Sequence, residues 1–274
     1  MAKAAAAAGF TVVAASREPA RLAPRASLGA RIRVVGFEGA GQELAQATHL
    51  LATAPPGPAG DPVLDRYTEA IAGAPRLGWI GYLSSTSVYG DCAGRAVDEE
   101  TAPAPTSERG RARLAAERAW LRAAGGRPFD LFRLAGIYGP GRSAFDQLRA
   151  GSARRILAPG HLFARIHRDD VVQAVLAAMR SPDGCGRVLN LADEAPAESA
   201  AVMEEAARLS GAPPPPAIGL AEAWPDMSAM ARGFWQERRR VLSERTRATL
   251  GLAWRYPSYR EGLAAIRAEE VGEG

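Results

Sequence analysis

The chain has 274 residues, of which 47% are hydrophobic and 23% charged, and its formal net charge is +4. This balance is typical of globular proteins, and because the arginines are interleaved with acidic residues it does not indicate a nucleic-acid-binding surface. No apolar run reaches the roughly 18 residues of a membrane span. Cys92 and Cys185 have neither a paired spacing nor a nearby histidine, which argues against a disulfide framework or a metal site. We therefore expect a cytoplasmic protein without a bound metal.

Strands and helices alternate along the first half of the chain. The expected strands are 10–14, 32–35, 49–52, 79–83 and 129–133. One expected helix ends at residue 8, and two others span 61–72 and 113–121. This alternation predicts an α/β fold with a doubly wound parallel sheet, whose ligand lies beyond the carboxyl ends of the strands.

The pattern loosens after Tyr138. Short strands are expected at 155–157, 163–167 and 188–191, and a helix at 170–179. We interpret residues 1–140 as a nucleotide-binding domain and residues 141–274 as a smaller mixed α/β part that binds the substrate. One or two elements of the second part are expected to return to the main sheet.

The start of the chain lacks two features of a dinucleotide-binding fold. Such a fold needs a first strand and a Gly-x-Gly-x-x-Gly turn, whose N–H groups hold the pyrophosphate, and neither precedes Gly9. The alanine-rich helix end and the β-branched strand that are present normally follow that turn. We expect that the chain begins at an internal methionine and that the central first strand, between the strands at Phe10 and His49, is missing. A natural domain without this strand is the alternative.

Ser16 and Arg17 directly follow the expected strand at 10–14, where the adenosine ribose of a dinucleotide would lie. An acidic residue there would accept a hydrogen bond from a free 2′-hydroxyl, whereas an arginine beside a small hydroxyl suits a 2′-phosphate. The pair therefore favours NADP, with NAD as the other candidate. An ordinary solvated arginine is the structural alternative.

Three segments carry a family resemblance. They are 82–91 (YLSSTSVYGD), 132–142 (FRLAGIYGPGR) and 165–172 (RIHRDDVV). In this order they resemble extended and atypical short-chain dehydrogenases of the NAD-dependent epimerase/dehydratase type. Ala54-Pro55-Pro56 with Gly60-Asp61-Pro62, and the segment 256–263 (YPSYREGL), are similar to an atypical subgroup of epimerases. The resemblance covers essentially the whole chain and implies a Rossmann domain, a small carboxyl-terminal substrate domain and a homodimer.

The resemblance also implies roles for individual residues. Ser85 matches the hydroxyl that binds the reacting oxygen of the substrate, and Arg165 falls where a basic residue contacts a phosphate. The cofactor residues implied, besides Ser16 and Arg17, are Ala52, Thr53, Ala54, Pro55, Ser84, Arg113, Ile137 and Tyr138. The substrate residues implied, besides Ser85, are Thr86, Arg109, Arg142 and Arg165.

The sequence departs from the family at the catalytic pair. The family has Tyr-x-x-x-Lys, in which the tyrosine moves a proton and the lysine lowers its pKa, but this chain has Arg109 and Arg113 at these positions. Arg113 can replace the charge of the lysine. Arg109 cannot shuttle protons because a guanidinium stays protonated, although it could pair with an anion.

Three other side chains are candidate acids. Tyr89 is nearest in sequence to Ser85, and the others are Asp61 and His167. Each has a structural alternative, since Tyr89 could be a packed aromatic, Asp61 the amino cap of a helix and His167 a turn residue. Arg109 and Arg113 could likewise lie on a solvated helix face.

Two functions are therefore predicted. The first is an NAD(P)-dependent oxidoreductase or epimerase that acts on a carbonyl or sugar-nucleotide-type small molecule, with Ser85, Arg113, Tyr89 and Asp61 as candidate catalytic residues. The alternative is a non-catalytic NADP-binding sensor or scaffold protein that has lost the Tyr-x-x-x-Lys pair.

Overall fold

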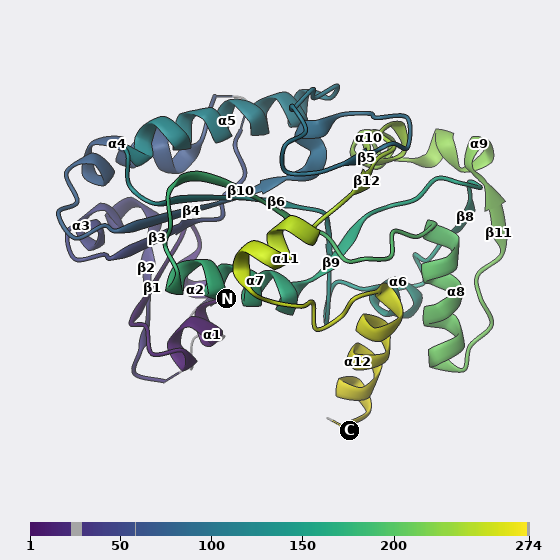
Figure 1. The fold of residues 1–274 in the computed structure, drawn as a ribbon. Helices are drawn as coiled ribbons and strands as arrows, with labels where there is room; N and C mark the ends of the chain where they lie inside the picture. Colours follow the sequence, from purple (N-terminus) through teal and green to yellow (C-terminus); the bar gives the residue numbers. More distant parts are fainter. Residues whose placement is uncertain (23–28, 58, 273–274) are drawn as a thin grey trace. The chain divides into compact units, whose positions relative to one another are not determined.

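Figure 1 shows the fold in a computed structural model, which describes residues 1–22, 29–57 and 59–272. The chain forms two compact units that are interleaved in sequence. Unit 1 comprises Met1–Leu83, Ala116–Leu131 and Val175–Arg187, and unit 2 comprises Ser84–Ala115, Phe132–Ala174 and Val188–Gly274. Neither unit is a continuous stretch of the chain, and the domain boundary expected at residue 140 stays a prediction. Among the described residues, no helix is long and apolar enough to cross a membrane.

Unit 1 is built on parallel strands. β1 (Val12–Ser16) pairs in parallel with β2 (Ile32–Gly36), and β3 (His49–Ala52) pairs in parallel with β4 (Trp79–Ser85). The larger sheet has the order β10-β6-β4-β3, with β6 at Phe129–Leu134 and β10 at Cys185–Leu191. Its strands β4, β6 and β10 each begin in unit 1 and end in unit 2. β10 of the carboxyl-terminal half thus lies at one edge of this sheet. In the part of the chain that the structure describes, no strand joins the β1–β2 pair to β3, and the missing central strand stays a prediction.

The helices that belong wholly to unit 1 are short apart from one. They are α1 (Ala2–Ala7), α2 (Pro19–Leu22), α3 (Gly41–Leu44) and α4 (Pro62–Ala72), with a 3-10 turn at Phe37–Gly39. Two longer helices, α5 (Glu108–Ala124) and α7 (Arg168–Arg180), begin in unit 2 and end in unit 1. The expected strands and helices of this half of the chain are present, with shifts in some of their bounds. β1 lies at Val12–Ser16 instead of 10–14, and α5 begins five residues earlier than expected (113 minus 108) and ends three residues later (124 minus 121).

Buried polar contacts hold the core of unit 1 together. The indole N–H of Trp79 donates to Asp130 at 2.7 Å, and the guanidinium of Arg187 contacts both carboxylate oxygens of Asp130 at 2.6 and 2.8 Å. Trp120 stacks on Tyr82 with 5.8 Å between the ring centres. β6 is buried along its whole length, which is typical of a strand that is covered on both faces of a sheet.

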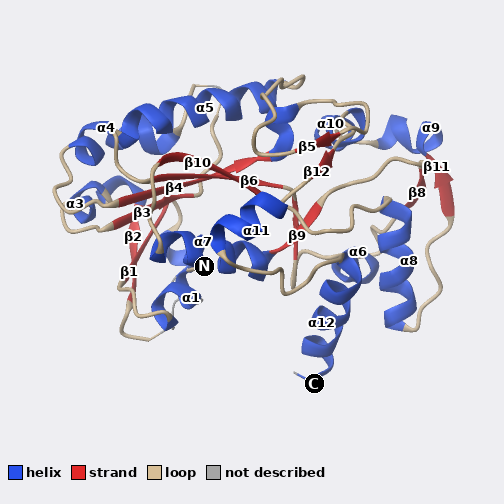
Figure 2. Ribbon diagram, viewed as in Figure 1, coloured by secondary structure: helices blue, strands red, loops and turns tan. Residues whose placement is uncertain are grey.

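Unit 2 contains small two-stranded pairs surrounded by helices (Figure 2). The parallel pairs are β5 (Ala96–Val97) with β12 (Arg240–Val241), β7 (Gly136–Tyr138) with β9 (Arg165–His167), and β8 (Arg155–Leu157) with β11 (Ala217–Gly219). The helices are α6 (Ala144–Arg149), α8 (Ser199–Ser210), α9 (Leu220–Ala223), α10 (Ala229–Gln236), α11 (Glu244–Leu250) and α12 (Tyr259–Gly272), with 3-10 turns at Thr86–Tyr89 and Trp224–Asp226.

Two helices of unit 2 lie side by side in Figure 1 although the sequence analysis did not predict them. α8 and α12 pack on one apolar cluster that includes Met203, Tyr259 and Leu263. α8 was missed because six of its twelve residues are alanine or serine, and such small side chains obscure the helical periodicity of hydrophobicity. The strand expected at 163–167 is also shorter, because the structure begins it at Arg165.

Candidate functional site

Hydroxyl side chains gather where β4 ends in unit 2, and we name residues Ser84–Ser87 the serine turn. Ser84 and Thr86 are buried, whereas Ser85 is half-buried. The Ser85 hydroxyl caps the 3-10 turn by accepting a hydrogen bond from the N–H of Ser87 at 3.2 Å. Ser87 Oγ is buried and has no hydrogen-bond partner among the described residues. The bond to Ser87 does not use the hydroxyl proton of Ser85, so Ser85 can still donate a hydrogen bond.

Glycine allows α5 to approach the serine turn closely. A Cβ at Gly110 would lie 2.7 Å from the Ser87 carbonyl oxygen and 2.9 Å from the Pro105 Cβ, which is closer than real contacts permit. The first turn of α5 therefore packs against the serine turn. Arg109 on this turn is exposed, whereas Arg113 is 8% exposed. The structure thus brings Ser85, Arg109 and Arg113 into one region of unit 2.

Tyr89 lies in a buried network of unit 2. Its hydroxyl is 2.8 Å from both the Asp98 carbonyl and Asn190 Oδ1, and the Arg133 guanidinium lies 4.9 Å from the centre of its ring. Burial raises the pKa of Tyr89, partly offset by the charge of Arg133. The ring is 1% exposed, so the hydroxyl proton is shared between protein acceptors. These contacts match the packing role that the sequence left open.

Asp61 lies in unit 1 as the amino cap of α4. Its Oδ1 accepts hydrogen bonds from the N–H groups of Val63 at 2.9 Å and Leu64 at 3.2 Å. Its other oxygen accepts a hydrogen bond from the indole N–H of Trp120 at 3.0 Å. The carboxylate is 4% exposed, so all its contacts are structural ones in unit 1.

His167 is held neutral inside unit 2. It is 1% exposed, and its Nδ1 accepts the N–H of Asp169 at 3.2 Å. Burial lowers the pKa of His167 to about 4, although the nearby Asp169 carboxylate acts in the opposite direction. The ring packs against Tyr138 and Tyr256, with ring centres 5.2 and 4.2 Å away. A neutral, enclosed imidazole of this kind is poorly suited to proton transfer.

The Ile137-Tyr138 segment forms strand β7. Ile137 is half-buried, whereas Tyr138 is 8% exposed and donates its hydroxyl to the Ser258 carbonyl at 3.3 Å. Burial raises the pKa of Tyr138, and the Asp193 and Asp170 carboxylates add to the effect. Only Ile137 of this predicted cofactor segment is therefore open to a ligand.

Two of the predicted substrate arginines of unit 2 differ in their surroundings. Arg165 donates to the carbonyls of Phe163 and Ala197, both at 2.9 Å, and burial lowers its pKa. Arg142 is exposed in a tight turn that it closes with Gly139. Arg142 is thus available to an anion, whereas the contacts of Arg165 are with the backbone.

The remaining predicted cofactor residues end two strands of unit 1. Ser16 is the last residue of β1, and its hydroxyl accepts the N–H of Glu18 at 3.1 Å. Arg17 is exposed, as are Thr53 and Pro55 after β3, whereas Ala54 is half-buried and Ala52 is buried. A half-buried hydroxyl and an exposed guanidinium thus lie at the carboxyl end of a parallel strand. The printed sequence has no Gly-x-Gly-x-x-Gly turn to hold the pyrophosphate.

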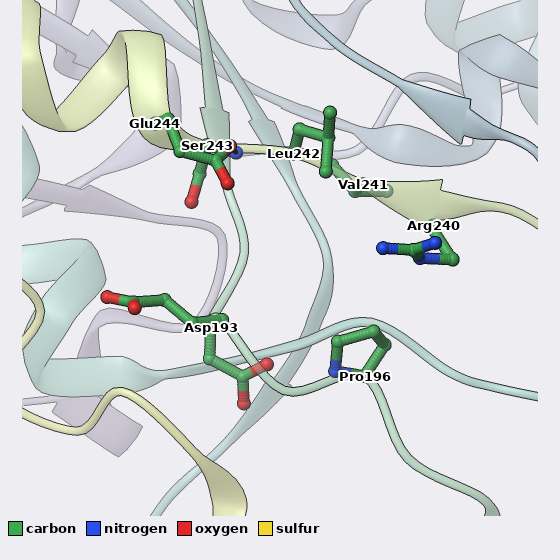
Figure 3. A pocket seen from close by; sticks show the side chains of 8 residues that line it. Asp193, Pro196, Arg240, Val241, Leu242, Ser243 and Glu244 are labelled. Carbon is green, nitrogen blue, oxygen red and sulfur yellow. Dashed lines mark hydrogen bonds between the residues drawn. The ribbon is translucent and has the colours of Figure 1, made fainter.

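A small pocket of unit 2 contains none of the predicted site residues. It has a volume of about 80 Å³ and lies between the loop after β10 and the segment from Arg240 to Glu244 (Figure 3). Asp193 lines it, is 3% exposed and has no well-formed hydrogen bond to either carboxylate oxygen among the described residues. Burial raises the pKa of Asp193 to about 7, while Arg165 and the approaching N–H of Ala195 lower it. The sequence carried no signal for this group.

Known proteins resemble this chain over much of its length. Residues 71–192 match the model of the NAD dependent epimerase/dehydratase family. A structure of a functionally unknown conserved protein from Silicibacter pomeroyi is 40% identical, with a TM-score of 0.90, and the match covers 98% of this chain and 94% of that one.

Two further comparisons are more limited. Protein YeeZ of Escherichia coli is 34% identical over 163 residues, which are 58% of this chain and 57% of that protein, so the chain matches little more than half of this curated relative. MoeE5, solved in complex with UDP-glucuronic acid and NAD, is 22% identical with a TM-score of 0.77 over 98% of this chain and 93% of that one. At this identity the likeness shows a shared Rossmann-like α/β fold.

Proposed function

Because the chain belongs, through residues 71–192, to the NAD-dependent epimerase/dehydratase family, we propose that it is an oxidoreductase that binds a nicotinamide dinucleotide. The substrate is a small molecule with a carbonyl group or of the sugar-nucleotide type. The observation that carries this proposal is the serine turn beside the first turn of α5, where Ser85 and the buried Arg113 belong to one region.

Ser85 would bind the reacting oxygen of the substrate. Its oxygen already accepts the N–H of Ser87, so the hydroxyl proton is the group that it can offer to a carbonyl. The positive charge of Arg113 would stabilise the negative charge that develops on that oxygen. A bound reduced dinucleotide would supply the hydride, and a proton would then convert the oxyanion, held by Ser85 and Arg113, to an alcohol.

The residues of this site favour reduction over epimerisation. Oxidation of a hydroxyl, the first half of an epimerase cycle, requires a base that takes its proton, and Arg109 cannot act as one. Reduction instead consumes a proton, which water can supply to an oxyanion. Because the hydroxyl of Tyr89 and the ring of His167 are enclosed by protein groups, solvent is the proton source that we assign.

We assign NADP as the preferred cofactor. The support for this is the position of Ser16 and Arg17 directly at the end of β1, on the carboxyl side of a parallel pair. A guanidinium binds a phosphate through two parallel hydrogen bonds. It has no acceptor atom for the proton of a free 2′-hydroxyl.

A non-catalytic NADP-binding sensor or scaffold is the second candidate. One observation favours it, which is that Arg109 occupies the position of the proton-transferring tyrosine of the family. In that case the serine turn would bind a ligand without turnover.

Titration with NADPH and NADH, followed by absorbance of the reduced nicotinamide with a panel of carbonyl compounds and sugar nucleotides, tests both functions. The oxidoreductase predicts tight NADPH binding, oxidation by at least one substrate, and a Ser85→Ala variant whose kcat is about 100-fold lower at unchanged NADPH affinity. The exposed Ser152→Ala variant is the control. Tight binding without oxidation by any substrate supports the sensor instead, and absence of binding contradicts both.

A further inference from the structure

α10 has two apolar faces, of which packing explains only one. Ala231 and Trp235 pack on a cluster of unit 2 formed around Met227. Met230 and Phe234 are also one helical turn apart, but they are 66% and 53% exposed. Large apolar side chains that lie together in solvent are typical of a binding surface. This second face is therefore a candidate for binding an apolar group.

The chain fixes α10 relative to the loop that leads from the serine turn to α5. The Thr106 hydroxyl donates to Glu237 at 3.1 Å, immediately after the end of α10. The N–H of Arg238 donates to the Asp91 carboxylate at 2.7 Å. These bonds join segments that are far apart in sequence, so the exposed face of α10 keeps its place beside the first turn of α5.

Arg109 provides a positive charge at the edge of this apolar face. Its guanidinium carbon lies 6.0 Å from the centre of the Phe234 ring, at the outer limit of a cation–π contact. The side chain is exposed, and no acidic side chain of the described residues forms an ion pair with it. A guanidinium binds a carboxylate, as it does a phosphate, through two parallel hydrogen bonds.

We propose that Arg109, Phe234 and Met230 bind an amphipathic carboxylic acid, with its carboxylate on Arg109 and its aromatic or aliphatic part on the exposed face of α10. This inference rests on the proposed function and narrows its substrate class, since the carbonyl to be reduced would then extend from Arg109 toward the serine turn. The chemistry disfavours a sugar nucleotide, because its hydroxyls would lose water against Met230 and Phe234 without gaining hydrogen-bond partners there.

Calorimetric titration of the protein with phenylpyruvate, pyruvate, phenylacetone and UDP-glucose tests this inference. Phenylpyruvate combines a carboxylate, a carbonyl and an aromatic ring. Pyruvate lacks the aromatic ring, and phenylacetone lacks the carboxylate. We expect phenylpyruvate to bind at least tenfold more tightly than either. Arg109→Gln should weaken phenylpyruvate binding about tenfold, and Phe234→Ala should do so for phenylpyruvate but leave pyruvate unchanged.

Arg122→Gln is the matched control, because Arg122 is an exposed arginine in the last turn of the same helix. The inference is overturned if UDP-glucose binds more tightly than phenylpyruvate, or if Arg109→Gln leaves phenylpyruvate affinity unchanged. NADPH affinity, measured on the same samples, separates this failure from failure of the proposed function. If NADPH binds normally but phenylpyruvate binds no more tightly than phenylacetone, which lacks the carboxylate, the proposed substrate class is wrong and the proposed function still stands.

Discussion

Replacement of Asp193 by asparagine is expected to stabilise the folded chain at neutral and alkaline pH. The carboxyl group is 3% exposed, and burial raises its pKa to about 7. The charge of Arg165 lowers this pKa, but the Arg165 guanidinium gives its hydrogen bonds to the carbonyls of Phe163 and Ala197. The ionised carboxylate is therefore buried without adequate compensation, whereas an asparagine of the same shape carries no charge.

The size and sign of the effect follow from the two pKa values of Asp193. The folded value of about 7 lies above the ordinary value of 3.8, so the folded state binds the proton more tightly than the unfolded state. The cost of ionisation is absent below about pH 4, grows by about 1.4 kcal/mol per pH unit as pH rises, and is constant above about pH 7. Above about pH 7 the ionised carboxylate therefore lowers the free energy of unfolding by about 4 kcal/mol.

Urea unfolding of both proteins at a series of pH values between 4 and 8 measures this difference. Asp98→Asn is the control of opposite sign, because hydrogen bonds from Thr101 and Glu100 lower the pKa of Asp98. That variant should lose most stability at neutral pH. A gap between Asp193→Asn and the parent chain that does not change with pH, or a less stable variant at pH 8, would refute the reasoning for Asp193.

Four further substitutions test contacts within one unit or the other by urea unfolding and by turnover. Asp61→Ala should lower the free energy of unfolding by about 2 to 4 kcal/mol, because it removes the helix cap and the partner of Trp120. Asp61→Asn should keep turnover, and a loss of turnover would instead indicate that Asp61 is the catalytic acid. Asp130→Ala should cost about 3 to 5 kcal/mol because it leaves the charge of Arg187 unpaired. Gly110→Ala should cost about 1 to 3 kcal/mol and reduce turnover, because the added methyl group displaces α5 from the serine turn; unchanged turnover would contradict that close approach.

The elements that the sequence predicted well are those with long, clear patterns. β3 was expected at 49–52, where the structure has it, and α4 combines helical spacing with an aspartate cap and a proline at its start. α8 and α10 were not predicted, because alanine, glycine and mixed aromatic residues obscure their periodicity. Sequence pattern thus determines an element where apolar and polar residues differ strongly, and leaves it open where they do not.

The candidate site was only partly accessible from sequence for a related reason. The spacing of the resembled family connects the serine turn with the arginines of α5, and their joint role in a site stays a prediction. The candidate acids depend on contacts between distant segments, since Tyr89 meets Asn190 across 101 positions and Asp61 meets Trp120 across 59. Such contacts decide whether a hydroxyl or carboxyl group is free, and they leave no local signature in the chain. If Tyr89 is catalytic, a bound ligand must break its hydrogen bond to Asn190 before the hydroxyl can act. If Tyr89 only packs in the core, that hydrogen bond stays intact.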